Sequence, residues 1–230
     1  MENTSANKTK GIYIAVLNQG SIRPELSMFL TDLTHQGKYN LCIKYPAQKP
    51  ISFNRNQLVK DFLSKPEYDY LLMLDGDIIP PLNVLDLALY DKDIAGGLCF
   101  GFLPGSLLVP FIMKENENGR YNVMELEGTE GMVKCDAIGS GCMMIKREVL
   151  EKVKYPFRNE YDEDGIKTKG LDFNFCTRAK EKGFETWCNV NMPCSHWTEM
   201  DLKDIYRWIT EAQTQKLVED GGIKIKDQKT

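Results

Sequence analysis

Short apolar runs alternate along the chain with segments whose apolar residues keep helical spacing. The runs are too short for buried helices and predict strands. The expected strands are residues 12–17, 39–45, 70–74, 94–100, 132–138, 142–145 and 184–190, and the expected helices begin near residues 24, 54, 82, 147 and 171. A repeated order of strand, helix and strand implies right-handed crossovers. The sequence therefore predicts an α/β fold with a Rossmann-type, mostly parallel central sheet flanked by helices.

Two segments interrupt this alternation. Residues 109–113 and 121–126 flank an Asn118-Gly119 turn, which is the signature of a β-hairpin. Residues 158–169 are polar and charged, and we expect a mobile loop there that serves as a lid or contacts an acceptor. The fold should thus carry a smaller antiparallel portion beside the main sheet.

The end of the chain shows a third pattern. Residues 201–219 have apolar positions at helical spacing, and the usual fate of such an amphipathic helix is to pack on its own domain. We expect one domain over residues 11–220 that includes this helix. Residues 1–10 and 221–230 are polar or charged and are expected to be flexible tails.

The most informative stretch is the apolar run 70–74, which ends in Asp75-Gly76-Asp77. Ligands of open α/β sheets bind at the carboxyl ends of the strands, so both carboxylates are expected in a ligand crevice. Two such groups suit a hard divalent cation that is also held by substrate phosphates. Gly76 permits a tight turn and a close approach to the backbone. A loop with two solvated aspartates is the alternative that the pattern leaves open.

Composition narrows the class of protein. The chain has 230 residues and a net charge of −4, which gives no electrostatic footprint for nucleic acid or for an anionic membrane. No apolar run is long enough to span a membrane, and the first residues lack a signal core. The seven cysteines contain no Cys-x-x-Cys pair, and we expect reduced, buried thiols in a cytoplasmic protein.

Several short motifs occur in a fixed order between about Gly11 and Trp197, and together they give a specific resemblance. They are Leu17-Asn18 after the first strand, Arg55-Asn56 on the second helix, Asp75-Gly76-Asp77, Gly139-Ser140-Gly141 before the strand 142–145, Leu171-Asp172, and Cys194-Ser195-His196-Trp197. In this order they resemble the GT-A glycosyltransferases, similar to the family 2 type, in which Asp75-Gly76-Asp77 would be the DxD motif.

The resemblance implies a nucleotide-diphosphate sugar donor, a divalent metal and a hydroxyl acceptor. A UDP- or GDP-sugar is the expected donor. Asp77, His196 and Asp75 would form the metal site, with Asp77 and His196 as ligands and Asp75 nearer the ribose or a metal-bound water. Mn²⁺ accepts a nitrogen ligand more readily than Mg²⁺ does, so Mn²⁺ is favoured. The donor itself would contact the matching positions Leu17, Asn18, Arg55, Asn56, Asp75, Gly76, Asp77, Gly139, Ser140 and Gly141.

Asp172 is the candidate general base that the resemblance implies. In inverting members of the family, an aspartate at this helix start takes the proton of the acceptor hydroxyl as it attacks the anomeric carbon. An aspartate in a first helical turn is also favoured by the helix dipole alone. Leu171 stands where the common family pattern has an acidic residue, which loosens the assignment of the acceptor site.

Two other functions fit parts of the same pattern. An apolar strand ending in Asp-x-Asp is also found in haloacid-dehalogenase-like phosphatases, where the first aspartate attacks phosphorus. A non-catalytic module that binds nucleotide sugars or carbohydrates is the second alternative. A calcium-binding EF-hand does not fit, because Ile79 occupies the third ligand position. The sequence favours no particular acceptor and no oligomeric state.

Overall fold

The computed structural model describes residues 10–18, 20–46, 49–103 and 107–219. The chain divides after His196 into two compact units. The first holds the central sheet and four α-helices. The second contains α5 (Leu202–Glu219), an amphipathic helix whose Leu202, Tyr206 and Ile209 are exposed. The expected flexible tails lie almost wholly outside the described residues.

A seven-stranded sheet forms the centre of the first unit, in the order β10-β15-β5-β12-β3-β1-β2. Only β10 and β12 run against the other five strands. The prediction of an α/β fold with a mostly parallel central sheet is therefore confirmed. The strands are β1 (Gly11–Leu17), β2 (Asn40–Lys44), β3 (Tyr70–Asp75), β5 (Ile94–Leu98), β10 (Met132–Cys135), β12 (Cys142–Lys146) and β15 (Thr186–Pro193).

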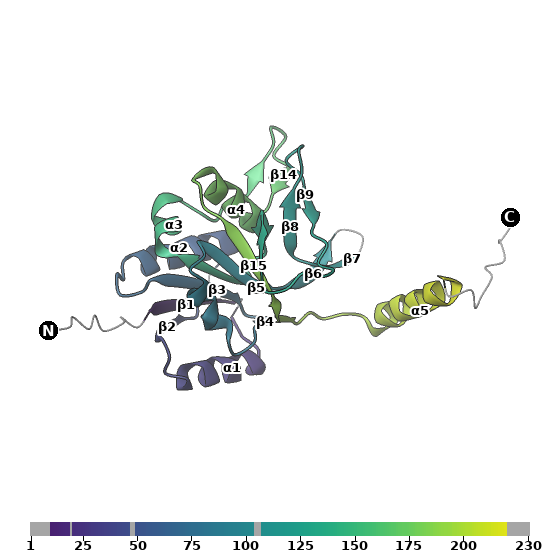
Figure 1. Cartoon of the computed structure of the whole chain (residues 1–230), viewed down its shortest axis with the longest axis horizontal. Coiled ribbons are helices and arrows are strands. Elements are labelled where there is room, and N and C mark those ends of the chain that lie inside the picture. The colour runs from purple at the N-terminus through teal and green to yellow at the C-terminus, as the bar shows by residue number, and fades with distance from the viewer. Residues whose placement is uncertain (1–9, 19, 47–48, 104–106, 220–230) are drawn as a thin grey trace. The chain divides into compact units, whose positions relative to one another are not determined.

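Helices cover both faces of this sheet because its strands are apolar on both sides. On β1, Tyr13 and Ala15 belong to one hydrophobic core and Ile12 and Ile14 to the other. The first core is shared with α2 (Ile51–Leu63), α3 (Arg147–Lys152) and α4 (Leu171–Glu181). The second is shared with α1 (Pro24–His35) and the 3-10 helix η1 (Val84–Tyr90). Figure 1 shows α1 on the opposite side of the sheet from α2 and α3.

The smaller elements are antiparallel pairs. They are β8 (Ile112–Glu115) with β9 (Tyr121–Val123) and with β11 (Ala137–Ile138), β6 (Phe100–Leu103) with β7 (Leu107–Pro110), β13 (Glu160–Tyr161) with β14 (Lys167–Lys169), and β4 (Ile78–Ile79) with β16 (Ser195–His196). The hairpin at Asn118-Gly119 is confirmed. The expected polar loop 158–169 contains the β13–β14 hairpin.

Several expected boundaries were wrong. The second helix begins at Ile51, just after Pro50, and not near residue 54. The helix expected over 82–90 is a 3-10 helix that begins at Val84. The strand expected over 94–100 ends at Leu98, and Phe100 starts the next one. Proline pairs and glycines shift element ends by a few residues without disturbing the hydrophobic period, so the period alone does not locate them.

Gly96 illustrates why glycine is needed inside β5. A Cβ atom there would lie 2.5 Å from Ile138 Cδ1 and 2.8 Å from the carbonyl oxygen of Cys142. Gly96→Ala should therefore lower the free energy of unfolding by about 1–3 kcal/mol, because the backbone of neighbouring β12 cannot yield. Urea denaturation measures this. Gly170→Ala is the control, since nothing lies within 4 Å of its Cβ position; it should cost roughly 0.5 kcal/mol, and an equal loss in both variants would contradict the account.

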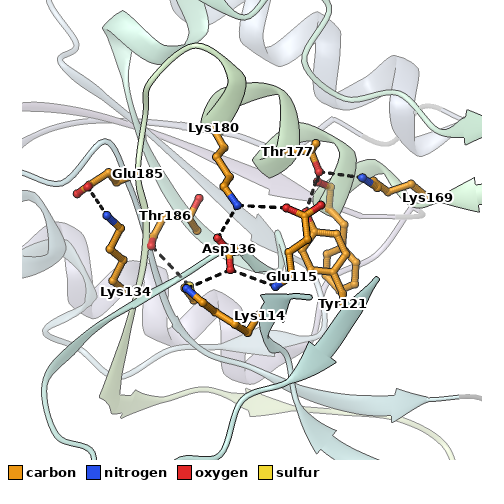
Figure 2. Close-up of polar contacts among 12 residues, drawn as sticks. Lys114, Glu115, Tyr121, Lys134, Asp136, Lys169, Thr177, Lys180, Glu185 and Thr186 are labelled. Carbon is orange, nitrogen blue, oxygen red and sulfur yellow. Dashed lines mark hydrogen bonds and ion pairs between the residues drawn. The ribbon is translucent and has the colours of Figure 1, made fainter. Parts of the chain in front are cut away.

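A polar cluster fixes α4 on the antiparallel strands (Figure 2). Lys180 of α4 donates to Asp136 Oδ1 at 2.9 Å and to Glu115 Oε2 at 3.1 Å. Lys114 lies 3.1 Å from Asp136 Oδ2, which also accepts the backbone N–H of Glu115. Asp136 is therefore the shared acceptor of three groups from two elements.

We expect the contribution of Asp136 to stability to disappear in acid. Burial alone raises the pKa of Asp136, but Lys180, the Glu115 N–H and Lys114 outweigh it and hold the pKa below its ordinary value. The folded state thus binds the proton more weakly, so the stabilisation is present at neutral pH and is lost as pH falls below about 4. Urea titrations of Asp136→Asn should show a deficit of about 1 kcal/mol at pH 7 that shrinks at pH 3.

Glu185→Gln provides the control for this test. Glu185 pairs with Lys134 in the same view, but both side chains are about half exposed. Exposed pairs contribute little, so this variant should stay within about 0.5 kcal/mol of the wild type at pH 7. A deficit for Asp136→Asn that does not change with pH would show that the residue acts through packing instead.

All seven cysteines are free, and six of them are buried, as the sequence predicted. No helix in the described part of the chain is long and apolar enough to cross a bilayer.

Candidate functional site

The carboxyl ends of β1 and β3 lie side by side and create the floor of the site. Leu17 pairs with Asp75, and the N–H of Gly76 donates to the Leu17 carbonyl at 2.7 Å. A Cβ at Gly76 would lie 3.0 Å from that oxygen and 3.3 Å from Asn18 Cβ. Gly76 is thus required by the close approach of the first strand, which turns the chain so that Asp75 and Asp77 both face the crevice beyond the sheet.

A cleft of about 1080 Å³ opens at this edge. Its lining includes five predicted positions, namely Leu17, Asn18, Asp75, Gly76 and Asp77. The remaining lining residues come from the starts of α1 and α2 and were missed by sequence reasoning: Ser21, Ile22, Arg23, Pro24, Lys49, Pro50, Ile51 and Asn54. The sequence pattern predicts the start of α2 near residue 54. A start at Ile51 would have indicated that the first turn of α2 lies at the same edge of the sheet as Asp75. The volume is slightly above the range of about 300–1,000 Å³ that is usual for small-molecule sites, so the cleft is large enough for a ligand.

Two asparagines shape one wall of the cleft. Asn18 Nδ2 donates to the carbonyl oxygen of Pro46 at 3.0 Å, and its Oδ1 accepts the N–H of Gly20. Asn54, buried in the first half of α2, donates to the same Pro46 oxygen at 3.2 Å. Asn18 and Asn54 therefore tie the segment after β2 to the ends of β1 and α2, which keeps this wall of the cleft ordered.

Asp77 and His196 are brought together by the pairing of β4 with β16, in which His196 stands opposite Ile78. His196 Nε2 lies 3.7 Å from Asp77 Oδ2. The Nδ1 atom contacts the carbonyl oxygen of Phe100. That contact assigns the proton to Nδ1 and leaves the Nε2 lone pair of a neutral ring directed toward Asp77, which is the arrangement of metal-binding histidines.

When the ring is protonated, His196 Nε2 and the carboxylate of Asp77 form an ion pair. Asp77 raises the pKa of His196 against the effect of burial, and His196 lowers the pKa of Asp77. A carboxylate and an imidazole fit Mn²⁺ better than Mg²⁺ by ligand type. In the described part of the chain, no three histidine, cysteine or acidic side chains cluster as a complete metal site. The pair thus fits an ion that takes its other ligands from substrate and water.

Arg55 lies at the centre of the site and is only 3% exposed. Its Nη2 atom donates to both oxygens of Asp75, at 3.0 and 3.3 Å, and its Nη1 atom donates to Asp172 Oδ1. Burial by itself lowers the pKa of Arg55, but the charges of Asp172 and Asp75 outweigh it and keep the guanidinium charged. Burial raises the pKa of Asp75, and this effect exceeds the lowering by the charge of Arg55. Arg55 is therefore a hydrogen-bond donor to two carboxylates at once.

Asp172 stands in the first turn of α4, after Gly170, whose extended backbone lets the helix begin. Its Oδ1 atom accepts from Arg55 and from the hydroxyl of Ser140 at 2.6 Å. Its Oδ2 atom accepts the Ser140 N–H at 3.2 Å. The side chain is 29% exposed. Oδ2 accepts this one hydrogen bond, and part of the Asp172 side chain is open to solvent.

Two other predicted donor contacts, Asn56 and Gly139, have neighbours within the fold. Asn56 exchanges hydrogen bonds with the backbone of Phe157, donating to its carbonyl at 2.6 Å and accepting its N–H at 3.2 Å. A Cβ at Gly139 would lie 3.6 Å from Phe111. Neither residue is among those that line the cleft. Gly141 contacts Asp75, because its carbonyl accepts the Asp75 N–H at 3.0 Å. Ser140 contacts Asp172, as described above.

Comparison with known proteins relates this architecture to solved structures. No protein-family model matches the sequence, and no curated protein matches it significantly. A197 from STIV is similar with a TM-score of 0.55 and 20% identity, over 83% of this chain and 86% of that one. GalNAc-T7, solved with UDP, GalNAc and Mn²⁺, has a TM-score of 0.50 and 10% identity over 85% of this chain. The match covers 45% of the GalNAc-T7 chain. These likenesses show that the fold is GT-A-like, as predicted.

Proposed function

We propose that this protein is a metal-dependent glycosyltransferase that transfers a sugar from a nucleotide-diphosphate donor to a hydroxyl acceptor. The observation that carries the proposal is the joining of three features at one sheet edge: a ligand-sized cleft, the Asp77 and His196 pair, and Asp172. The GT-A-like fold supports it, as does GalNAc-T7, which was solved with UDP, GalNAc and Mn²⁺. A UDP- or GDP-sugar is the proposed donor.

Each group has a place in the proposed reaction. The acceptor oxygen forms a bond to the anomeric carbon while its proton passes to Asp172 Oδ2. The bond from that carbon to the diphosphate breaks, and its electron pair stays on the phosphate oxygen. Attack on the face opposite the leaving group inverts the anomeric centre. General-base catalysis of this kind contributes about 10²–10⁴-fold to the rate.

Asp77 and His196 are the residues that would hold the divalent cation, for which we propose Mn²⁺. When bound there, such an ion would neutralise the negative charge that develops on the diphosphate. Asp75 lies close by, but Arg55 contacts both of its oxygens. We therefore propose that Asp75 acts beside the metal, toward the ribose or a bound water, and does not bind the ion directly.

The phosphatase alternative receives less support. A haloacid-dehalogenase-like mechanism needs the first aspartate as a free nucleophile. Asp75 would be that residue, and the guanidinium of Arg55 reduces the electron density available on both of its oxygens. A non-catalytic module that binds the same nucleotide sugar would share the cleft, but it would have no need for a base at Asp172.

The test is the thermal stability of the purified protein with UDP, GDP, CDP, ADP or dTDP, each with Mn²⁺ and with EDTA. A ligand at a hundredfold excess over its Kd should raise stability by about 2.7 kcal/mol. We expect one nucleotide to act, and only with Mn²⁺. The sugar donors of that base are then assayed for release of the nucleotide diphosphate. Binding without turnover would favour the module, and phosphate release from an aryl phosphate would favour the phosphatase.

A further inference from the structure

A single guanidinium connects the two halves of the site. Asp75 ends β3 and lines the cleft, whereas Asp172 begins α4 and is not among the lining residues. Arg55 donates to both, through Nη2 to Asp75 and through Nη1 to Asp172. It approaches from the middle of α2, so three separate elements meet at one buried positive charge.

The turn before β12 makes a second connection between the same two carboxylates. Gly141 accepts a hydrogen bond from the Asp75 N–H, and a Cβ at Gly141 would lie 3.4 Å from Asp75 Oδ2. The adjacent Ser140 is fully buried and donates twice to Asp172. Asp75 and Asp172 are therefore linked by two routes, one through Arg55 and one through the turn before β12. We expect a displacement of Asp75 to reach Asp172 through these contacts.

Arg55 has little freedom to move. Its guanidinium lies 5.6 Å from the centroid of the buried Phe157 ring, and Asn56 holds the Phe157 backbone on both sides. Its Nε atom is buried and has no hydrogen-bond partner among the described residues. Among the described residues, the hydrogen bonds of the guanidinium go to Asp75 and Asp172. Loss of charge at one carboxylate therefore leaves the other as the anionic partner of a buried guanidinium, so the two carboxylates are expected to be energetically coupled through Arg55.

We propose that Arg55 is a positioning residue that couples the nucleotide cleft to Asp172, so that ligand binding beside Asp75 and the charge on Asp172 influence each other. This inference takes the nature of the ligand from the proposed function. Thermodynamic coupling of this kind acts equally in both directions. In this proposal Arg55 binds the two carboxylates and not a phosphate of the donor. Occupation of the donor site would then change the environment of the base, Asp172.

The binding test is a cycle of four proteins: wild type, Asp172→Asn, Arg55→Met and the double variant. Isothermal titration calorimetry measures the Kd of UDP and of GDP in the presence of Mn²⁺. We expect Asp172→Asn to change the Kd about fivefold or more when Arg55 is present and less than about twofold in the Arg55→Met background. An equal change in both backgrounds, or no change in either, would overturn the coupling.

Arg147 offers a matched control. It is a second arginine over a phenylalanine ring, 4.3 Å from the centroid of Phe62, but its hydrogen bonds go to backbone carbonyls such as that of Tyr68. Arg147→Lys should reduce stability and leave the effect of Asp172→Asn on the Kd unchanged. If Arg55→Met does not fold, Arg55→Lys replaces it, because an ammonium group lacks the planar fork that reaches both carboxylates.

A second cycle needs no nucleotide and separates this inference from the proposed function. Urea unfolding of Arg55→Met is measured alone and combined with Asp172→Asn or with Asp75→Asn. We expect each carboxylate to be coupled to Arg55 by about fivefold or more in the unfolding equilibrium constant. If no nucleotide binds the wild type, the proposed function fails and this cycle decides the coupling by itself. Coupling under about twofold for either carboxylate would overturn it.

Discussion

Asp172→Asn should lower the rate of sugar transfer by about 10²–10⁴-fold, the range that general-base catalysis contributes. The reason is local. Asparagine keeps an oxygen that can accept from Arg55 and from the Ser140 hydroxyl, and it loses only the acceptor of the Ser140 N–H, so the start of α4 should stay in place. It offers no anionic oxygen to the acceptor proton. Steady-state kinetics should therefore show the loss in kcat, with a far smaller change in the KM of the donor.

Asp164→Asn is the control for this prediction. Asp164 is an exposed acidic residue in the loop between β13 and β14. It belongs to the segment 158–169, which the sequence predicts to be a lid or to contact an acceptor. It should retain the wild-type rate within a factor of about two, as expected for a surface charge. If Asp164→Asn abolished transfer and Asp172→Asn did not, the base would lie in the β13–β14 loop, and Asp172 would be a structural acceptor for Arg55 and Ser140.

Asp77→Ala should remove the metal-dependent response to nucleotide and lower transfer by about 10³-fold. Metal stabilisation of developing charge contributes several kcal/mol, and each 1.4 kcal/mol corresponds to a factor of ten. Asp77 provides the carboxylate that faces His196 Nε2 at 3.7 Å, so its loss would leave His196 as the one proposed protein ligand. Thermal scans with Mn²⁺ and the nucleotide identified by screening provide the measurement, and kinetics at increasing Mn²⁺ concentrations provide a second one.

Two comparison variants make the result specific. His196→Ala should show the same loss, because His196 is the other member of the pair. Asp32→Ala removes an exposed carboxylate from α1 and should leave the metal-dependent shift intact. A metal response that survives in both Asp77→Ala and His196→Ala would move the cation to another part of the protein. A shift that vanished in Asp32→Ala as well would indicate general loss of stability.

The carboxyl end of β3 could be predicted from the sequence because every signal there is local. The apolar run 70–74 is too short for a helix, and Gly76 and Pro80 limit where the strand can end. Asp75 and Asp77 thus had to lie at a strand end, where α/β proteins bind ligands. A glycine inside an apolar strand is a local signal of the same kind, because it indicates a close neighbour, and Gly96 of β5 lies against Cys142 of β12.

The partners of the charged residues were decided by the tertiary structure. Arg55 is separated from Asp75 by 20 positions and from Asp172 by 117, and nothing in the local pattern of α2 distinguishes a buried arginine from a surface one. The cleft wall at Ser21 and Asn54 and the contact between His196 and Phe100 likewise join distant segments. Hydrophobic period fixes which side of an element is buried, whereas the pairing of charges depends on the order of strands in the sheet.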